Sequence, residues 1–97
     1  MKNKIEEYFN GHYHKFYQRY LRDCKNIGGN EYIALCPFHD DKTPSFNFNS
    51  ESGLYLCRGC GRKGNALHFY AKLNGFDTKR DFPKILQGIA RDFGIDI

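Results

Sequence analysis

The residues of this sequence best suited to chemistry are two closely spaced pairs of potential metal ligands. Cys36 and His39 form the first pair, Cys57 and Cys60 form the second, and seventeen residues lie between the pairs. Two ligands in one tight turn can bind the same ion, and a hairpin can bring two such turns together. Three sulfurs and one imidazole nitrogen in a tetrahedral array select Zn²⁺ over hard cations such as Mg²⁺ or Ca²⁺. The spacing therefore predicts one zinc ion bound by these four residues.

The predicted zinc ion has a structural role. Four protein ligands complete a tetrahedral shell, so no position is left for an activated water molecule. The sequence also lacks a His-x-Glu pair beside the cysteines, which argues against a zinc deaminase. The remaining cysteine, Cys24, is expected to be a free thiol at the end of a helix. The neighbouring acids Asp40 and Asp41 are expected to belong to a solvated loop.

The composition indicates one small folded domain that needs such reinforcement. The chain has 97 residues, of which 40% are hydrophobic and 27% are charged. Aliphatic side chains are few, so the nine Phe and seven Tyr must supply most of the core. A core of this size is marginal, and a closed zinc site can add on the order of 10 kcal/mol. We therefore expect residues 1–97 to form a single zinc-binding domain.

The sequence predicts a cytoplasmic protein without a membrane partner. No apolar run approaches the roughly 20 residues that a helix needs to cross a bilayer, and the first residues lack the hydrophobic segment of a secretion signal. Cysteines in a reducing compartment bind metals more often than they form disulfides. The cytoplasmic expectation thus agrees with the predicted zinc site.

Basic residues gather in one part of the sequence. The formal net charge is +4, and no Asp or Glu lies between Glu51 and Asp77. The same stretch holds Arg58, Arg62, Lys63 and Lys72. A mildly basic chain with its positive charge concentrated in this way suggests a polyanionic partner.

Helices and short strands are predicted to position the metal ligands. Apolar residues at a period near 3.6 predict an N-terminal helix over about residues 4–22. Short strands joined by turns predict a zinc ribbon over about residues 31–62, and Asn65 is a favourable N-cap for a helical part over about residues 65–94. The expected fold class is α+β. It is a small zinc ribbon whose short antiparallel sheet is flanked by the N-terminal helix and two C-terminal helices.

The metal-ligand pairs lie within longer motifs that resemble a known family. The segment 36–46, CPFHDDKTPSF, is similar to the N-terminal zinc-binding domain of DnaG-type DNA primases. The second pair continues the resemblance as Tyr55-x-Cys57-x-x-Cys60-Gly61, followed by Gly64-Asn65-Ala66, and the resemblance covers about residues 15–97. Arg58 stands where cellular members often carry an aromatic residue. Such variation is common among primases of phages and mobile elements, so the resemblance allows a cellular or a mobile-element origin.

The resemblance implies a module that binds single-stranded template DNA and helps a primase begin an RNA primer during DNA replication. It implies as partners the primase catalytic domain, in cis or in trans, and a replicative helicase. The chain contains none of that catalytic domain, so no catalytic residue is expected. The candidate DNA contacts are Arg58, Arg62 and Lys63 beside the second pair, Lys42 beside the first, and Tyr55 for base stacking.

A different class of function is also compatible with these residues. The chain could be a zinc-ribbon protein-interaction module of a phage or mobile-element replication protein, without direct DNA contact. In that case the basic side chains would only solvate the loops beside the metal ligands. Binding of single-stranded DNA by the isolated domain separates the two hypotheses.

Overall fold

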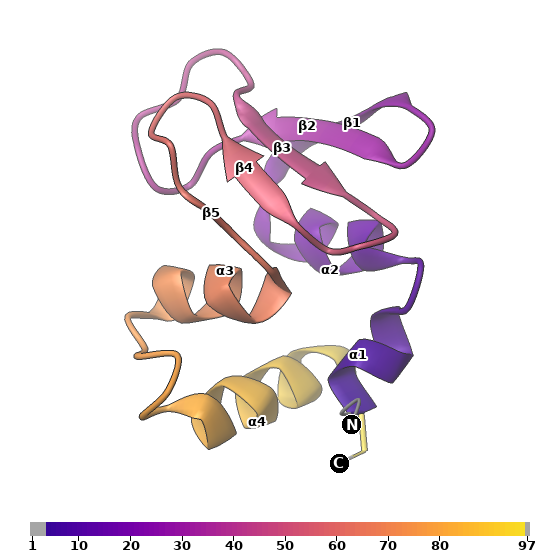
Figure 1. Ribbon diagram of the computed structural model, residues 1–97, viewed down its shortest axis with the longest axis vertical. Coiled ribbons are helices and arrows are strands. Elements are labelled where there is room, and N and C mark those ends of the chain that lie inside the picture. Colours follow the sequence, from indigo (N-terminus) through magenta and orange to yellow (C-terminus); the bar gives the residue numbers. More distant parts are fainter. Residues whose placement is uncertain (1–3, 97) are drawn as a thin grey trace.

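Helices cover one face of a five-stranded antiparallel sheet in the computed structural model, which describes residues 4–96 (Figure 1). The strands neighbour each other in space in the same order as in the sequence. The α+β class expected from the sequence is therefore confirmed. The elements, in chain order, are α1 (Lys4–Phe9), α2 (Tyr13–Tyr20), β1 (Arg22–Gly28), β2 (Glu31–Leu35), β3 (Phe46–Asn49), β4 (Tyr55–Cys57), β5 (Lys63–Gly64), α3 (Ala66–Asn74) and α4 (Phe82–Phe93).

The helices form two layers below the sheet (Figure 1). Helices α2 and α3 contact each other and the sheet, while α1 and α4 lie beyond them and contact each other. Aromatic rings fill the space between these layers, as the shortage of aliphatic residues required. The fully buried rings come from α1, α2, β3 and α3, and they are Phe9, Phe16, Tyr17, Phe46, Phe48 and Phe69.

The N-terminal part differs from the prediction of one helix over residues 4–22, which is wrong. Helix α1 ends at Phe9 and α2 begins at Tyr13. Gly11 between them has a left-handed backbone with φ of 75°, a conformation that interrupts a right-handed helix and that glycine adopts at little cost. The break lets the two short helices lie at an angle in different layers while both keep their apolar faces buried (Figure 1).

A strand that the sequence did not predict follows α2. Strand β1 pairs with β2 through backbone hydrogen bonds, with two irregularities in its register. Nearly all of its side chains are exposed, so it shows no alternation of apolar and polar residues that would mark a strand. Cys24 consequently lies on this edge strand, not at the end of a helix as expected.

Capping residues define ends of the two C-terminal helices, which lie in the region where the sequence predicted helical structure. The side chain of Asn65 accepts a hydrogen bond from the His68 N–H at 2.9 Å, and the His68 ring accepts one from the Asn65 N–H at 3.2 Å. This reciprocal pair is a capping box, with histidine in the place of the usual Glu or Gln. Gly75 and Gly94 end the helices in the left-handed conformation. Within residues 4–96, no helix combines the length and the apolar character needed to span a membrane.

Candidate metal centre

The sheet brings the two ligand pairs to the same end of the molecule. Strands β2 and β4 lie on either side of β3 and are both antiparallel to it, so they run in the same direction. Cys36 directly follows β2, and Cys57 is the last residue of β4. Phe46 of β3 pairs with Ala34 on one side and with Cys57 on the other. Consequently, the turns that carry the ligands leave the sheet beside each other.

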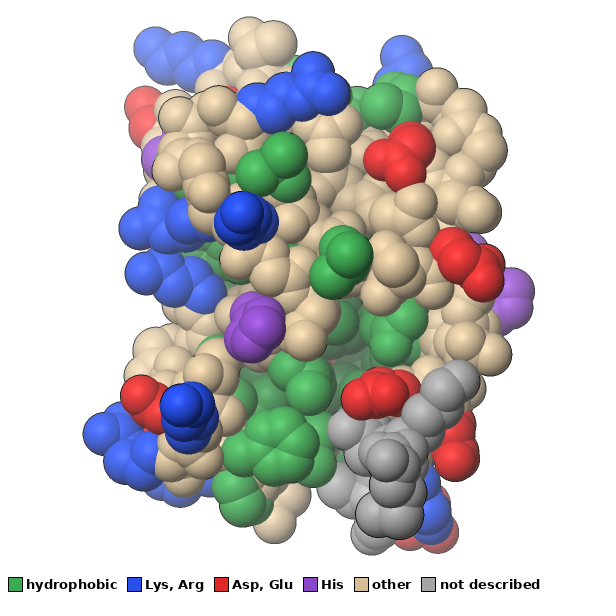
Figure 2. Space-filling view, in the orientation of Figure 1, with side chains coloured by type: hydrophobic (Ala, Val, Ile, Leu, Met, Phe, Trp, Pro, Cys, Tyr) green, Lys and Arg blue, Asp and Glu red, His purple; other side chains and the backbone are tan. Residues whose placement is uncertain are grey.

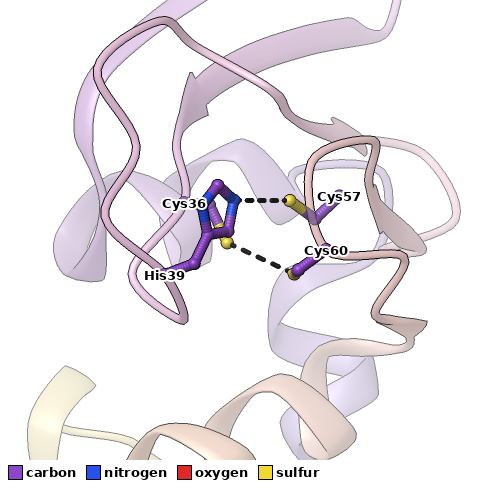
Figure 3. A group of neighbouring side chains, drawn as sticks. All are labelled: Cys36, His39, Cys57 and Cys60. Carbon is purple, nitrogen blue, oxygen red and sulfur yellow. Dashed lines mark hydrogen bonds between the residues drawn. The ribbon is translucent and has the colours of Figure 1, made fainter.

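The four predicted ligands form one cluster. The ligand atoms of Cys36, His39, Cys57 and Cys60 all lie within 4.8 Å of one another (Figure 3). The Sγ atoms of Cys36 and Cys60 are 4.0 Å apart, and His39 Nε2 is 3.3 Å from Cys57 Sγ. Tetrahedral zinc, with bonds of about 2.3 Å to sulfur and about 2.0 Å to nitrogen, requires separations of roughly 3.5–3.8 Å. The donor set and its spacing therefore fit one zinc ion.

Cys36 and Cys57 differ in how readily they ionise before a cation binds. Burial raises the pKa of Cys36 to about 12, and the neighbouring Cys57 and Cys60 add to this effect. Burial also opposes ionisation of Cys57, but hydrogen bonding with the Ser45 side chain and with the Cys60 N–H outweighs it and lowers the pKa of Cys57 to about 7. A divalent cation offsets the repulsion among three thiolates. Metal binding at this site is therefore coupled to proton release.

Asp41 organises the loop that carries the first ligand pair. Its Oδ2 accepts hydrogen bonds from the Cys36 N–H at 2.8 Å and from the Ser45 N–H and hydroxyl at 3.2 and 2.9 Å. These bonds hold the pKa of the Asp41 carboxyl below its usual range. The Ser45 hydroxyl oxygen also lies 3.5 Å from the Cys57 sulfur. Asp41 thus supports both ligand pairs, and the expectation that it is only a solvated loop residue is wrong.

We expect Asp41→Ala to weaken zinc binding about tenfold, because groups that orient metal ligands typically contribute 10–100-fold to affinity. The neighbouring Asp40 is exposed and provides a control with the same change of charge and size. Competition with a chromogenic zinc chelator measures both variants. Equal affinities for Asp40→Ala and Asp41→Ala would show that the hydrogen bonds of Asp41 do not support the site.

The basic residues proposed to contact DNA surround the zinc end of the sheet. Lys42 lies in the loop after the first ligand pair, Arg58 and Arg62 flank Cys60, and Lys63 lies on β5. The ion pairs found in residues 4–96 involve none of these four side chains. Figure 2 shows Lys and Arg side chains gathered along the left side of the molecule, whereas several acidic side chains lie on the right. One side of the molecule is therefore richer in positive charge than the other.

Tyr55 does not occupy the half-exposed position that was expected of it, and the prediction of a stacking surface there is wrong. Its side chain is only 6% exposed, and its ring stacks on Phe46 with centroids 5.0 Å apart. Side chains alternate between the two faces of a strand, and here the exposed positions are those of Leu54 and Leu56 on either side of Tyr55, at 56% and 45%. Phe38 is the ring missed by the sequence analysis. It is half-buried, and the Arg62 guanidinium lies 5.8 Å from its centroid.

Comparisons with known proteins agree with this geometry. The CHC2 zinc finger family model matches residues 17–97. The DNA primase of a Synechocystis species is 41% identical over 69 residues, which are 71% of this chain and 10% of that protein. The DNA primase of Lactococcus lactis is 59% identical over 46 residues, 47% of this chain and 7% of that protein. The chain thus spans about a tenth of the length of these curated relatives.

A solved structure shares the fold as well as part of the sequence. The crystal structure of the Aquifex aeolicus primase, with its zinc-binding and RNA polymerase domains, matches all of this chain at a TM-score of 0.71 and 25% identity. The match covers 23% of that longer chain. These findings confirm the resemblance carried by the motif at residues 36–46. With its Cys-His-Cys-Cys cluster and a family match over residues 17–97, the chain belongs to the CHC2 zinc finger family and binds one structural zinc ion.

Proposed function

We propose that this chain is the zinc-binding domain of a DNA primase, which binds single-stranded template DNA and helps to initiate RNA primers in DNA replication. The observation that carries the proposal is the group of unpaired basic side chains beside the zinc ligands, formed by Lys42, Arg58, Arg62 and Lys63. The relatives described above are DNA primases, which supports the same role. The zinc ion holds these side chains on one side of the molecule by joining the loops that carry them.

Phosphate contacts would supply most of the binding free energy at this surface. Tyr55 is buried, so base stacking falls to Phe38, whose ring lies beneath the Arg62 guanidinium. A guanidinium over a ring can contact a phosphate or stack on a base. With a net charge of only +4, binding should be weak and should fall steeply with salt. Irregular loops and a sheet favour single strands over a duplex groove.

The proposed partner within a primase is its catalytic domain, in cis or in trans. The Aquifex aeolicus structure joins a zinc-binding domain to an RNA polymerase domain in one protein, which supports this partner. The template strand would then be held by this chain while the catalytic domain joins nucleotides. A replicative helicase is an expectation from the resemblance alone.

Fluorescence anisotropy with a labelled single-stranded 20-mer tests the proposal. We expect micromolar or weaker binding by the zinc-loaded chain. The double change Arg62→Ala and Lys63→Ala should weaken binding to all DNA sequences. The number of phosphate contacts, obtained from the dependence of the binding constant on salt, should fall by about two. The matched control is Lys15→Ala with Lys25→Ala, which removes the same charge from exposed positions on α2 and β1. Equal binding by the two double variants would show that these charges only solvate the loops.

One observation favours a second candidate function, a protein-interaction module without DNA contact. Leu54, just before β4, and Leu56 within it are both exposed. Exposed apolar side chains that lie close together are typical of protein contact surfaces. A zinc-loaded chain that does not bind the 20-mer at low salt would leave this function as the better explanation.

A further inference from the structure

The basic surface beside the zinc ligands continues from Arg62 and Lys63 along α3 to Lys72. An open groove of about 420 Å³ runs between β5, one face of α3 and the connection from α3 to α4. Its lining includes Arg62 and Lys63 on the sheet side and Lys72 and Phe76 on the helix side. This volume is within the range of about 300–1,000 Å³ that is typical of small-molecule sites. The groove is therefore large enough for one nucleotide.

Local structure holds the walls of the groove in place. The backbone of Gly64 approaches α3 so closely that an added Cβ would lie 2.8 Å from the Cβ of His68, which the capping box fixes in the first turn of the helix. Lys72 lies one turn further along the same helix face. Beyond the left-handed Gly75, the Phe76 N–H donates a hydrogen bond to the Ala71 carbonyl at 2.8 Å. These contacts place cations and a ring around one groove.

The charge of the groove is strongly one-sided. Arg62, Lys63 and Lys72 take part in none of the ion pairs found in residues 4–96. Asp77 is the single acid in the lining, and its Oδ1 already accepts hydrogen bonds from the Lys79 N–H and Arg80 N–H at 2.9 and 2.8 Å. Like charges that converge on a concave surface without a partner raise the local concentration of anions. A phosphate group is the ligand that would match them.

Phe76 indicates that the ligand has a ring as well as a phosphate. Its side chain is half-buried and lies in the groove lining, where it packs at a tilt against Tyr70 with centroids 6.4 Å apart. One face of such a ring can stack on an unpaired base. We propose that this groove binds one nucleotide, with the phosphate between Arg62, Lys63 and Lys72 and the base against Phe76. Where the nucleotide belongs to a bound DNA strand, this proposal rests on the proposed function and adds a specific binding site to it.

Variants of the two helix-side residues test the groove separately from the zinc end. Lys72→Ala should weaken binding of a fluorescein-labelled dT20 about fivefold and lower the number of phosphate contacts by about one. Phe76→Leu should cost a similar factor with an unchanged salt dependence, because stacking releases few counterions. The matched controls are Lys15→Ala, on an exposed helical site, and Phe82→Leu, since Phe82 is 41% exposed at the start of α4. Both controls should bind like the unchanged chain.

Amide chemical shifts of the zinc-loaded chain locate the ligand directly and do not depend on any variant. Added dT20 should shift the amides of residues 62–64, 68, 72 and 76, and a separate titration with ATP shows whether a free nucleotide binds there too. Shifts in these residues with either ligand support the groove. If dT20 binds but Lys72→Ala, Phe76→Leu and these amides are unaffected, the groove proposal is wrong and the proposed function stands. If neither dT20 nor ATP binds, both proposals are wrong.

Discussion

Removal of zinc is expected to abolish the cooperative unfolding of this chain. Cys57 is fully buried at the end of β4, and the loop that carries Cys36 and His39 contacts its sulfur through the His39 ring and the Ser45 hydroxyl. A closed zinc site contributes on the order of 10 kcal/mol, which equals the whole stability of many small domains. Chelation at neutral pH, or Cys57→Ser, should therefore replace a sharp thermal transition in the circular dichroism signal with a gradual one.

Cys24→Ser is the matched control for Cys57→Ser. Cys24 lies on β1, outside the cluster of ligands. Its substitution should leave both the zinc content and the melting temperature nearly unchanged. A chelated chain that keeps a sharp transition would contradict the structural role of the metal, and loss of zinc from Cys24→Ser would show that the ligand set is incorrect.

The second large effect is expected from Gly59→Ala, a change of one methyl group between the ligands of the second pair. A Cβ at Gly59 would lie 2.7 Å from His39 Nε2 and 3.0 Å from Ser45 Oγ. Contacts this short force the imidazole away from the metal, because the ring is held between the two ligand loops. We expect zinc affinity to fall about a hundredfold, the upper end of the range for changes next to metal ligands.

Gly61→Asn provides the control for Gly59→Ala in the same loop. Gly61 has a left-handed backbone with φ of 76°, but no atom lies within 4 Å of the position of an added Cβ. Asparagine tolerates this conformation better than other residues with side chains. Zinc competition should therefore give nearly unchanged affinity for Gly61→Asn. If Gly59→Ala binds zinc as tightly as Gly61→Asn does, the close approach of the backbone to His39 is not required.

The sequence predicted the metal site better than it predicted the surface around it. Two ligand pairs joined by alternating strands can meet in very few ways, so residue types and spacing alone identified the cluster that the structure shows. The C-terminal helices were also predictable, because Asn65, Gly75 and Gly94 act through local backbone geometry. For these helices, the interactions that decide the structure lie within a few residues of the caps.

The errors arose where contacts distant in sequence decide the structure. Strand β1 forms because its backbone pairs with that of β2. The side chains of β1 show no alternation that would predict a strand. Tyr55 is buried with its ring stacked on Phe46 in a core that has few aliphatic residues, whereas the neighbouring leucines remain exposed. The role of Asp41 is the exception, because its partners Cys36 and Ser45 lie only five and four residues away along the chain. The spacing of four residues between Asp41 and Ser45 was the one signal of it in the sequence.

We propose that the zinc ion assembles the surface to which single-stranded DNA binds. The most direct test of this proposal is the binding of a labelled single-stranded 20-mer by one preparation, before chelation, after chelation and after return of one equivalent of zinc. We expect binding to be lost with the metal and restored by one equivalent, in parallel with the circular dichroism signal of the folded chain. DNA binding that is unchanged after zinc removal, or absent from the zinc-loaded folded chain at low salt, would contradict it.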